Sequence, residues 1–274
     1  MRVKQEIVMS KFAPVVPMPV AQVLWNAEYL GGYHLLLAHD VVSSPTLQAA
    51  YQQLYGNDIP RKFQDSCVIM DNSVVELGEA FNFEDCLRAA HAANADYLVA
   101  ADCFLDHVAT MRRSTEFLNK FTAAAEYSAK LKLMGVVQGS TLDECMECAG
   151  MYARNTWFGA IAVPRCLTPV LGSRMQVLMQ IQKRFAGRFK NIHMLGFSDN
   201  LIDDICCARL PFVSGIDSAA PIRGALQGIK FQLPVTDFGP RGDFWLTGGM
   251  QAEAALPMII DNLSTVRQLI YSGN

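Results

Sequence analysis

Carboxylate and amide side chains end several apolar runs in this sequence, where a chain commonly turns from a strand into a helix. Asp71 ends "CVIMD", Asp102 follows "YLVAA", Gln138 ends "GVVQ" and Asp217 ends "VSGID". Two carboxylates in one pocket can divide a reaction at a sugar carbon, one as nucleophile and one as proton donor and acceptor. A single aspartate at such a point would be read as a helix cap, but several in one cleft raise one another's pKa. The grouping therefore predicts a carboxylate-based active site.

These residues lie at one end of a repeating strand and helix pattern. From residue 33 onward, apolar runs typical of buried parallel strands alternate with segments of helical period, at a spacing of roughly 25 to 35 residues. The predicted strands are 33–42, 66–73, 96–104, 132–139, 157–165, 191–199 and 211–218. The predicted helices are 44–56, 83–94, 106–130, 141–155, 173–189, 200–210, 220–228 and about 252–271. Thr141 and Glu144 predict a capped start for the helix at 141–155.

The pattern favours one α/β domain over residues 1–274, a (β/α)8 TIM barrel, with an open doubly wound sheet as the alternative. Seven strands are predicted, and an eighth is expected within 229–249, with "IKFQL" at 229–233 as the candidate. Residues 1–32 are expected to form an N-terminal appendage or lid. In such a barrel the carboxyl ends of the strands meet at one end, here called the mouth, where function gathers.

Composition narrows the class of protein without selecting a partner. The formal net charge of -3 gives no global basic field, although a local patch could still bind phosphates. The eight cysteines are scattered through predicted strands and helices, which indicates reduced thiols in a cytoplasmic protein, or in the host cytoplasm if the protein is viral. Pro14, Pro17 and Pro19 interrupt the apolar N-terminal stretch, so we expect neither a signal peptide nor contact with a membrane.

Five motifs, in one order over about residues 66–225, resemble those of the tRNA-guanine transglycosylases, the queuine and archaeosine tRNA-ribosyltransferases. These barrel enzymes exchange guanine in a polynucleotide for a 7-deazaguanine. "GVVQGS" is similar to the family's Gly-Ile-Val-Gln-Gly-Gly strand, and "FGAIAVPR" to its Gly-Gly-Leu-Ala-Val-Gly-Glu segment. Residues 193–225 are similar to the stretch from a Met-Gly-Val-Gly turn to the nucleophile. "IMDNS" resembles the acid/base segment, and "AADCF" the segment that reads the base.

The resemblance implies a role for each matching residue. Asp217 would attack C1′ and form a covalent glycosyl intermediate, and Asp71 would be the acid and base. Asp102 and Gln138 would bind the heterocycle; an amide also suits its edge by chemistry alone, and Gly139 leaves room for a ligand at the backbone. The other implied substrate contacts are the backbone at Ala160 and Ile161, Leu195 with Gly196, Arg165, and Arg223, which would support a loop or a phosphate.

The departures from the family pattern refine the expected substrate. Val75 and Leu195 stand where the family sandwiches the base between an aromatic residue and a methionine. Arg165 replaces a glutamate, which disfavours a cationic aminomethyl base and favours 7-cyano-7-deazaguanine. The family's zinc motif is missing after Asp217, and the lone CxxC of Cys145 and Cys148 lies inside a predicted helix, so we expect no metal and no cofactor. The chain is then closest in character to the zinc-less branch, frequent in bacteriophages, that modifies DNA.

Several alternatives stay open. DNA is the preferred nucleic acid and tRNA the alternative; a non-catalytic accessory subunit and an unrelated barrel glycosidase or aldolase are the rivals. A homodimer, the sequence context and the role of His39 and Asp40, at the end of the first predicted strand, are also open. Phosphate contacts are expected from Arg61–Lys62, Arg112–Arg113, Lys183–Arg184, Arg188 and Lys190.

Overall fold

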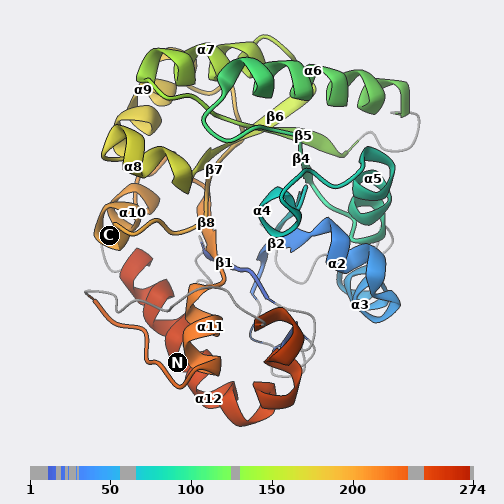
Figure 1. The fold of residues 1–274 in the computed structure, drawn as a ribbon, viewed down its shortest axis with the longest axis vertical. Coiled ribbons are helices and arrows are strands. Elements are labelled where there is room, and N and C mark those ends of the chain that lie inside the picture. The colour runs from blue at the N-terminus through green and yellow to red at the C-terminus, as the bar shows by residue number, and fades with distance from the viewer. Residues whose placement is uncertain are drawn as a thin grey trace, which may run out of the picture.

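The computed structural model describes residues 12–16, 20, 21, 24, 29, 31–55, 66–124, 130–233 and 244–271. Eight parallel strands form one sheet in the order β1-β8-β7-β6-β5-β4-β3-β2. Because β1 also lies beside β2, the sheet curls into a nearly closed barrel with helices around it (Figure 1). The predicted α/β (β/α)8 TIM barrel is therefore confirmed.

Strands and helices alternate along the chain. The strands are β1 (Phe12–Pro14), β2 (Tyr33–Leu37), β3 (Cys67–Asp71), β4 (Tyr97–Val99), β5 (Lys132–Val136), β6 (Phe158–Pro164), β7 (Asn191–Leu195) and β8 (Gly215–Ser218). The helices are α2 (Ala38–Ser43), α3 (Pro45–Tyr55), α4 (Val74–Leu77), α5 (Phe83–Ala92), α6 (His107–Ala124), α7 (Leu142–Ala153), the 3-10 helix η2 (Arg165–Leu167), α8 (Thr168–Leu171), α9 (Met175–Phe185), α10 (Leu201–Ala208), α11 (Ala220–Leu226) and α12 (Phe244–Tyr271).

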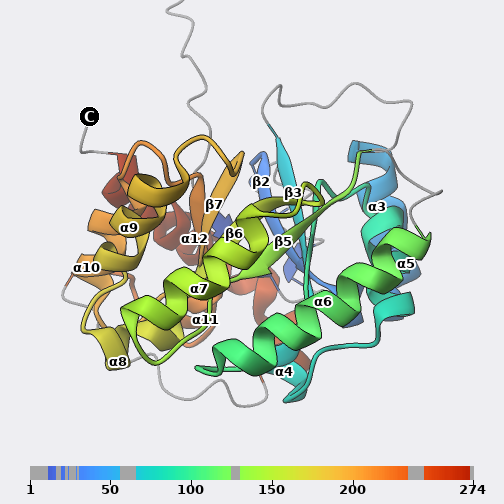
Figure 2. The ribbon, with the colours of Figure 1, turned by 90° about the horizontal axis from the view of Figure 1, so that it is seen from above.

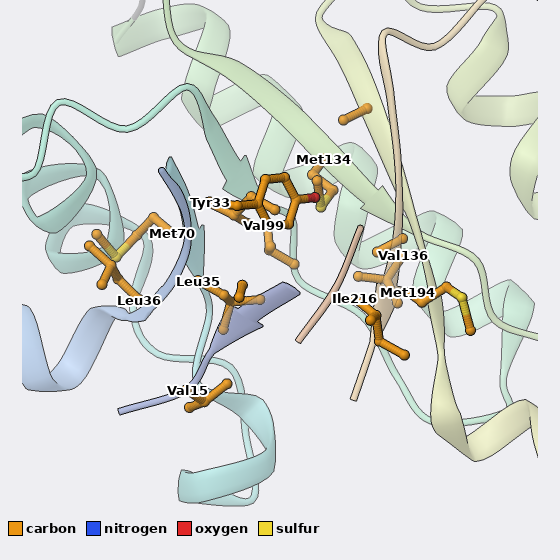
Figure 3. Close-up of a cluster of buried hydrophobic side chains, with 14 of the residues drawn as sticks. Val15, Tyr33, Leu35, Leu36, Met70, Val99, Met134, Val136, Met194 and Ile216 are labelled. Atoms are coloured by element: carbon orange, nitrogen blue, oxygen red, sulfur yellow. The ribbon is translucent and has the colours of Figure 1, made fainter. Parts of the chain in front are cut away.

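The strands are apolar on both faces because each is covered from both sides. In β6, Gly159 alone is partly exposed and the other positions are buried. One face packs inside the barrel, where side chains of several strands meet in an apolar cluster (Figure 3). The other face is covered by helices, and α6 and α7 lie across the outside of β5 and β6 (Figure 2). Parallel strands need this double cover, which is why the sequence shows continuous apolar runs.

The N-terminal segment corrects the sequence prediction. Residues 12–14 form β1, which pairs with β8 so that Ala13 lies opposite Asp217, whereas an appendage or lid was predicted over residues 1–32. The eighth strand predicted at 229–233 is wrong, because no strand forms there and the Phe231 N–H donates to Asn262 Oδ1 at 2.7 Å. Proline argues against a long helix but not against a short strand whose recorded ladder runs along one side, where its missing N–H is tolerated.

The predicted element boundaries differ from the structure mainly at the mouth. Strands β4, β5 and β7 end several residues before the predicted limits, because their polar last residues turn into loops. Residues 38–43, predicted to continue the first strand, form α2. The predicted cap of α7 is confirmed, since the Thr141 hydroxyl accepts the Glu144 N–H and the Glu144 carboxylate accepts the Thr141 N–H.

A buried ion pair ties the carboxyl ends of β6 and β7 to α10. Arg174 and Asp204 are both fully buried, and Arg174 NH2 donates to Asp204 Oδ1. Arg174 NH1 donates to the carbonyl oxygens of Val163 at 3.1 Å and Leu195 at 3.3 Å. The other oxygen of Asp204 accepts the backbone N–H of Ser198 at 2.6 Å. This network fixes the turn that follows β7.

Replacing Arg174 by methionine is expected to lower the free energy of unfolding by about 3–5 kcal/mol, because it leaves the Asp204 carboxylate buried without its cation. Urea denaturation measures the loss. The double variant Arg174→Met, Asp204→Asn should recover part of it by removing the unpaired charge. An equal or larger loss in the double variant would show that the ion pair is not the source of the effect.

Candidate active site

Three predicted site carboxylates meet at the mouth of the barrel. Asp71 is the last residue of β3, Asp102 follows β4, and Asp217 lies near the end of β8. Their exposed fractions are 8%, 2% and 7%. The negative charges of Asp217 and Asp102 both act on Asp71, so the three carboxylates lie within electrostatic reach of one another. The sequence prediction that these residues share one site is supported by this grouping.

Asp71 has one oxygen held and one oxygen unengaged. Its Oδ2 accepts the N–H of Ser73 at 2.9 Å, in a tight turn where Ser73 has a φ of 60°. Its Oδ1 accepts no hydrogen bond from any described residue. Burial raises the pKa of Asp71 well above its usual range, and the negative charge of Glu76 raises this pKa further. Asp71 is therefore poised to hold a proton near neutral pH.

Asp102 is engaged at both oxygens. Its Oδ1 accepts from Asn72 Nδ2 at 3.3 Å, and its Oδ2 accepts from Gln138 Nε2 at 2.8 Å. Burial raises the pKa of Asp102, and these two amide donors oppose the rise. Each carboxylate oxygen has a second lone pair, so Asp102 can still accept from a ligand. The arrangement suits recognition more than proton transfer.

Gln138 is fully buried with its amide orientation fixed. Its Oε1 accepts the backbone N–H of Leu105 at 3.0 Å and the thiol of Cys166 at 3.4 Å. Burial raises the pKa of Cys166 to about 11, so the sulfur keeps the proton that it donates. Because Oε1 can act only as acceptor, the Nε2 group must point to Asp102, which fixes the pair as one unit.

Asp217 is held on one side by two N–H donors. Its Oδ1 lies 2.9 Å from His193 Nε2 and 3.0 Å from the backbone nitrogen of Gly196. Gly196 has a φ of 73°, a conformation that glycine adopts without strain, and this turns its N–H toward the carboxylate. Asp217 Oδ2 accepts no hydrogen bond from the described part of the chain. The unengaged oxygen is the one available to a substrate.

Arg165 and Leu195 lie around this turn, as the resemblance implies. Arg165 is exposed at the start of η2, and its Cδ lies 3.1 Å from where a side chain on Gly196 would begin. Leu195 is half-buried at the end of β7, next to Gly196. A guanidinium therefore stands at the mouth, on the side of Asp217.

Gly139 has a packing reason that the sequence did not reveal. A Cβ at this position would lie 2.8 Å from the backbone nitrogen of Cys145 and 2.8 Å from the Cβ of Glu144. A side chain would thus collide with the first turn of α7. Close approach of a ligand to Gly139 remains a prediction, but glycine is required there without one.

Ala160 and Ile161 are not among the residues gathered at the mouth. Both are fully buried within β6, and Ala160 pairs with Asn191 at the start of β7, whereas Pro164 pairs with Leu195 at its end. At about 3.3 Å per residue, Ala160 lies roughly 13 Å from Pro164 along the strand. Val75, expected to cover the base, is 44% exposed on α4.

The remaining candidates have mixed positions. Arg223 is half-buried in α11, the helix that follows β8. His39 and Asp40 lie in α2 rather than on a strand, with His39 Nε2 and Asp40 Oδ1 3.4 Å apart. Burial raises the pKa of Asp40, the positive charge of His39 lowers it, and the negative charge of Glu76 raises it again. The pair thus lies near the same acidic turn as Asp71.

Most predicted phosphate contacts lie away from the mouth. Lys183 and Arg184 are in the last turn of α9, and Lys190 directly precedes β7, so all three lie at the opposite end of the barrel. Arg188 lies between them in the chain, and its guanidinium donates to the carbonyl oxygens of Ala153 and Asn155. In α6, Arg112 is exposed, and Arg113 donates to the backbone oxygen of Asp102 at 3.0 Å. Residues 61 and 62 lie outside the described residues.

No metal-binding group emerges from the described side chains, because no three of His, Cys, Asp or Glu gather in a suitable arrangement. Cys145 and Cys148 are both buried in α7, where their thiols donate to the carbonyl oxygens of Gly139 and Val136. Burial raises the pKa of Cys145 to about 12 and that of Cys148 to about 11. Among the described helices, none is long and apolar enough to cross a membrane.

Three residues of the site were not predicted: Asn72, His193 and Tyr33. Asn72 Nδ2 binds Asp102, and Tyr33 OH lies 2.8 Å from His193 Nδ1. A signal for His193 was present. Side chains alternate along a strand, so a histidine two residues before Leu195 points to the same side, and in an apolar strand such a residue needs a buried partner.

The sequence matches no protein-family model and no curated protein.

Replacing Asp71 by asparagine is expected to stabilise the protein at neutral pH. The folded-state pKa of Asp71 lies above its unfolded value, so its stabilising contribution is complete below the unfolded pKa, about 4, and is lost as pH rises through the raised pKa. The gain of the variant should therefore grow with pH. Thermal unfolding from pH 4 to pH 8 measures it, at about 2–4 °C for each 1 kcal/mol in a chain of this size.

Asparagine can still accept the Ser73 N–H, so the turn after β3 is retained. Asp199→Asn, the same change at an exposed carboxylate, is the control. A gain in Asp71→Asn that is constant with pH would contradict the raised pKa.

Proposed function

We propose that this chain is a guanine transglycosylase, a pentosyltransferase that exchanges guanine in DNA for a 7-deazaguanine through a covalent aspartyl intermediate. One observation carries the proposal. Asp71 and Asp217 share the mouth of the barrel, and each keeps one oxygen held while the other accepts nothing from the described residues. A structural carboxylate is satisfied at both oxygens, as Asp204 is.

The first half-reaction follows from the different surroundings of the two carboxylates. Oδ2 of Asp217 forms a bond to C1′ of the nucleoside while the bond from C1′ to the base breaks. The bonding electrons leave with guanine, which takes a proton from Asp71. Burial and the charge of Glu76 raise the pKa of Asp71, and this supports its role as the acid. His193 and Gly196 donate to the other oxygen of Asp217, which favours an ionised nucleophile.

The second half-reaction reverses these roles. The incoming 7-deazaguanine gives a proton to the Asp71 carboxylate, and its ring nitrogen attacks C1′. The bond from C1′ to Asp217 breaks, and the carboxylate is restored. Water in the pocket would hydrolyse the intermediate, so the bound base must nearly fill the site between the two steps.

Recognition of the base is assigned to Asp102 and Gln138, with Asn72 as support. Their hydrogen bonds to one another fix where a ligand finds acceptors and donors before it arrives. The exposed guanidinium of Arg165 stands next to the turn that binds Asp217. A cationic aminomethyl group would be repelled there, so we propose a neutral base such as 7-cyano-7-deazaguanine.

DNA is preferred over tRNA because the sequence lacks the zinc motif that the tRNA enzymes carry after the nucleophile. A guanine in duplex DNA would have to be flipped out of the stack to reach the buried carboxylates. The accessory-subunit alternative is disfavoured by the presence of both Asp71 and Asp217 at one mouth.

Base exchange tests the proposal. We expect the purified protein to incorporate labelled guanine into DNA in place of its own guanine. Asp217→Asn and Asp71→Asn should each reduce this exchange by about 10³-fold or more, since each removes a group used in the bond-breaking step. A covalent complex of protein and DNA, resistant to denaturation, should form with the wild type and not with Asp217→Asn.

Asp199→Asn, at an exposed aspartate, is the matched control and should exchange at the wild-type rate. Exchange into tRNA but not DNA would overturn the choice of nucleic acid. Exchange that survives in Asp217→Asn would overturn the assigned nucleophile, and no exchange with either substrate would overturn the function.

A further inference from the structure

A chain of polar groups runs through the apolar interior of the barrel beneath Asp217. Tyr33, at the start of β2, is 2% exposed, and His193, in β7, is fully buried. Figure 3 shows the ring of Tyr33 extending from its strand into the cluster of apolar side chains. Tyr33 OH lies 2.8 Å from His193 Nδ1, and His193 Nε2 lies 2.9 Å from Asp217 Oδ1. The chain of contacts links the core to the mouth.

The protons of this chain can be assigned from its contacts. An ionised carboxylate only accepts, so His193 Nε2 must donate to Asp217 Oδ1. A neutral imidazole then has a bare Nδ1, which accepts the Tyr33 hydroxyl proton. Burial raises the pKa of Tyr33 well above its usual range, so the hydroxyl remains a donor. Both hydrogen bonds therefore point toward Asp217.

The direction of the chain decides which oxygen of Asp217 is free. Oδ1 receives two N–H donors, from His193 and Gly196, while Oδ2 receives none from the described residues. With Oδ1 held, the carboxylate has a defined rotation, and Oδ2 faces the mouth.

We propose that Tyr33 and His193 are positioning residues, which fix Asp217 in the ionised state and orientation that present Oδ2 to C1′. This inference rests on the proposed function, because the purpose of the orientation is attack on a nucleoside. Neither residue touches the substrate. Tyr33 acts through His193, and His193 acts through Asp217, as the orienting group does in other nucleophile and base pairs.

The barrel offers a matched control for this pair. His34, the next residue of β2, is also buried, and its Nδ1 lies 3.2 Å from the hydroxyl of Tyr51 in α3. Its Nε2 contacts the carbonyl oxygen of Gly31 at 2.9 Å and not a carboxylate. Changes at His34 and Tyr51 thus disturb a buried pair of the same type on the same strand, without a link to Asp217.

The first experiment reads the histidine directly in the full chain and does not need activity. Nitrogen NMR on protein with isotope-labelled histidine resolves five imidazoles, and His193 is assigned by its loss in His193→Gln. We expect a neutral ring with the proton on Nε2 and a hydrogen-bonded Nδ1. Tyr33→Phe should shift the Nδ1 signal, whereas Tyr51→Phe should not. A proton on Nδ1, alone or together with one on Nε2, overturns the proposal.

The second experiment separates positioning from folding by kinetics. His193→Phe should lower kcat for base exchange by about 100-fold with little change in KM, because a donor to the nucleophile is lost. His193→Gln keeps an N–H donor near Nε2 and should recover most of this loss. Tyr33→Phe should lower kcat by about tenfold in the wild type. It should have no further effect in His193→Phe, because the link to Asp217 is already broken.

Tyr51→Phe should leave kcat unchanged even if it lowers the melting temperature. A loss of kcat in Tyr33→Phe that is equally large with and without His193 would overturn the relay. So would a failure of glutamine to restore activity while the variant remains folded. If the wild type exchanges no base, the proposed function fails, while the NMR result still decides whether the hydrogen-bond chain exists.

Discussion

Taking carboxylates out of water is the constraint that organises one end of this barrel. A buried carboxylate is tolerated when N–H donors replace its lost hydration. Asp204 receives a guanidinium and a backbone N–H, and Asp102 receives two amides. Asp71 and Asp217 receive donors at one oxygen each. The four residues thus range from wholly structural to half-satisfied, and the half-satisfied pair is where chemistry can occur.

The structural and the reactive carboxylates are connected through the turn after β7. Arg174, neutralised by Asp204, binds the carbonyl oxygen of Leu195. The next residue, Gly196, directs its N–H to Asp217. The ion pair therefore holds the peptide that supplies one donor to the proposed nucleophile. The cost of burying that pair is offset by the rigidity it gives to a turn with positive φ.

The sequence predicted the repeating units well and the barrel seam poorly. The runs that became β3 to β8 are apolar on both faces, a property visible in the sequence itself. The strand at residues 12–14 is too short to show a period, and its pairing with β8 is a long-range contact that no local pattern encodes. Asp71, Asp102, Gln138 and Asp217 were recognised because polar residues end apolar runs. His193 was missed because it lies within such a run, where its partner comes from another strand.

The pairing of β1 with β8 has a consequence for synthesis of the protein. Asp217 lies opposite Ala13, so the strand that holds the proposed nucleophile takes its place against residues made at the very beginning of translation. The early segment must wait without its neighbour until almost the whole chain has left the ribosome. A nascent or prematurely terminated chain would hold Asp71 and Asp102 but lack the reactive carboxylate and its strand. The pocket is thus built last, and a partial product cannot form a glycosyl bond to nucleic acid.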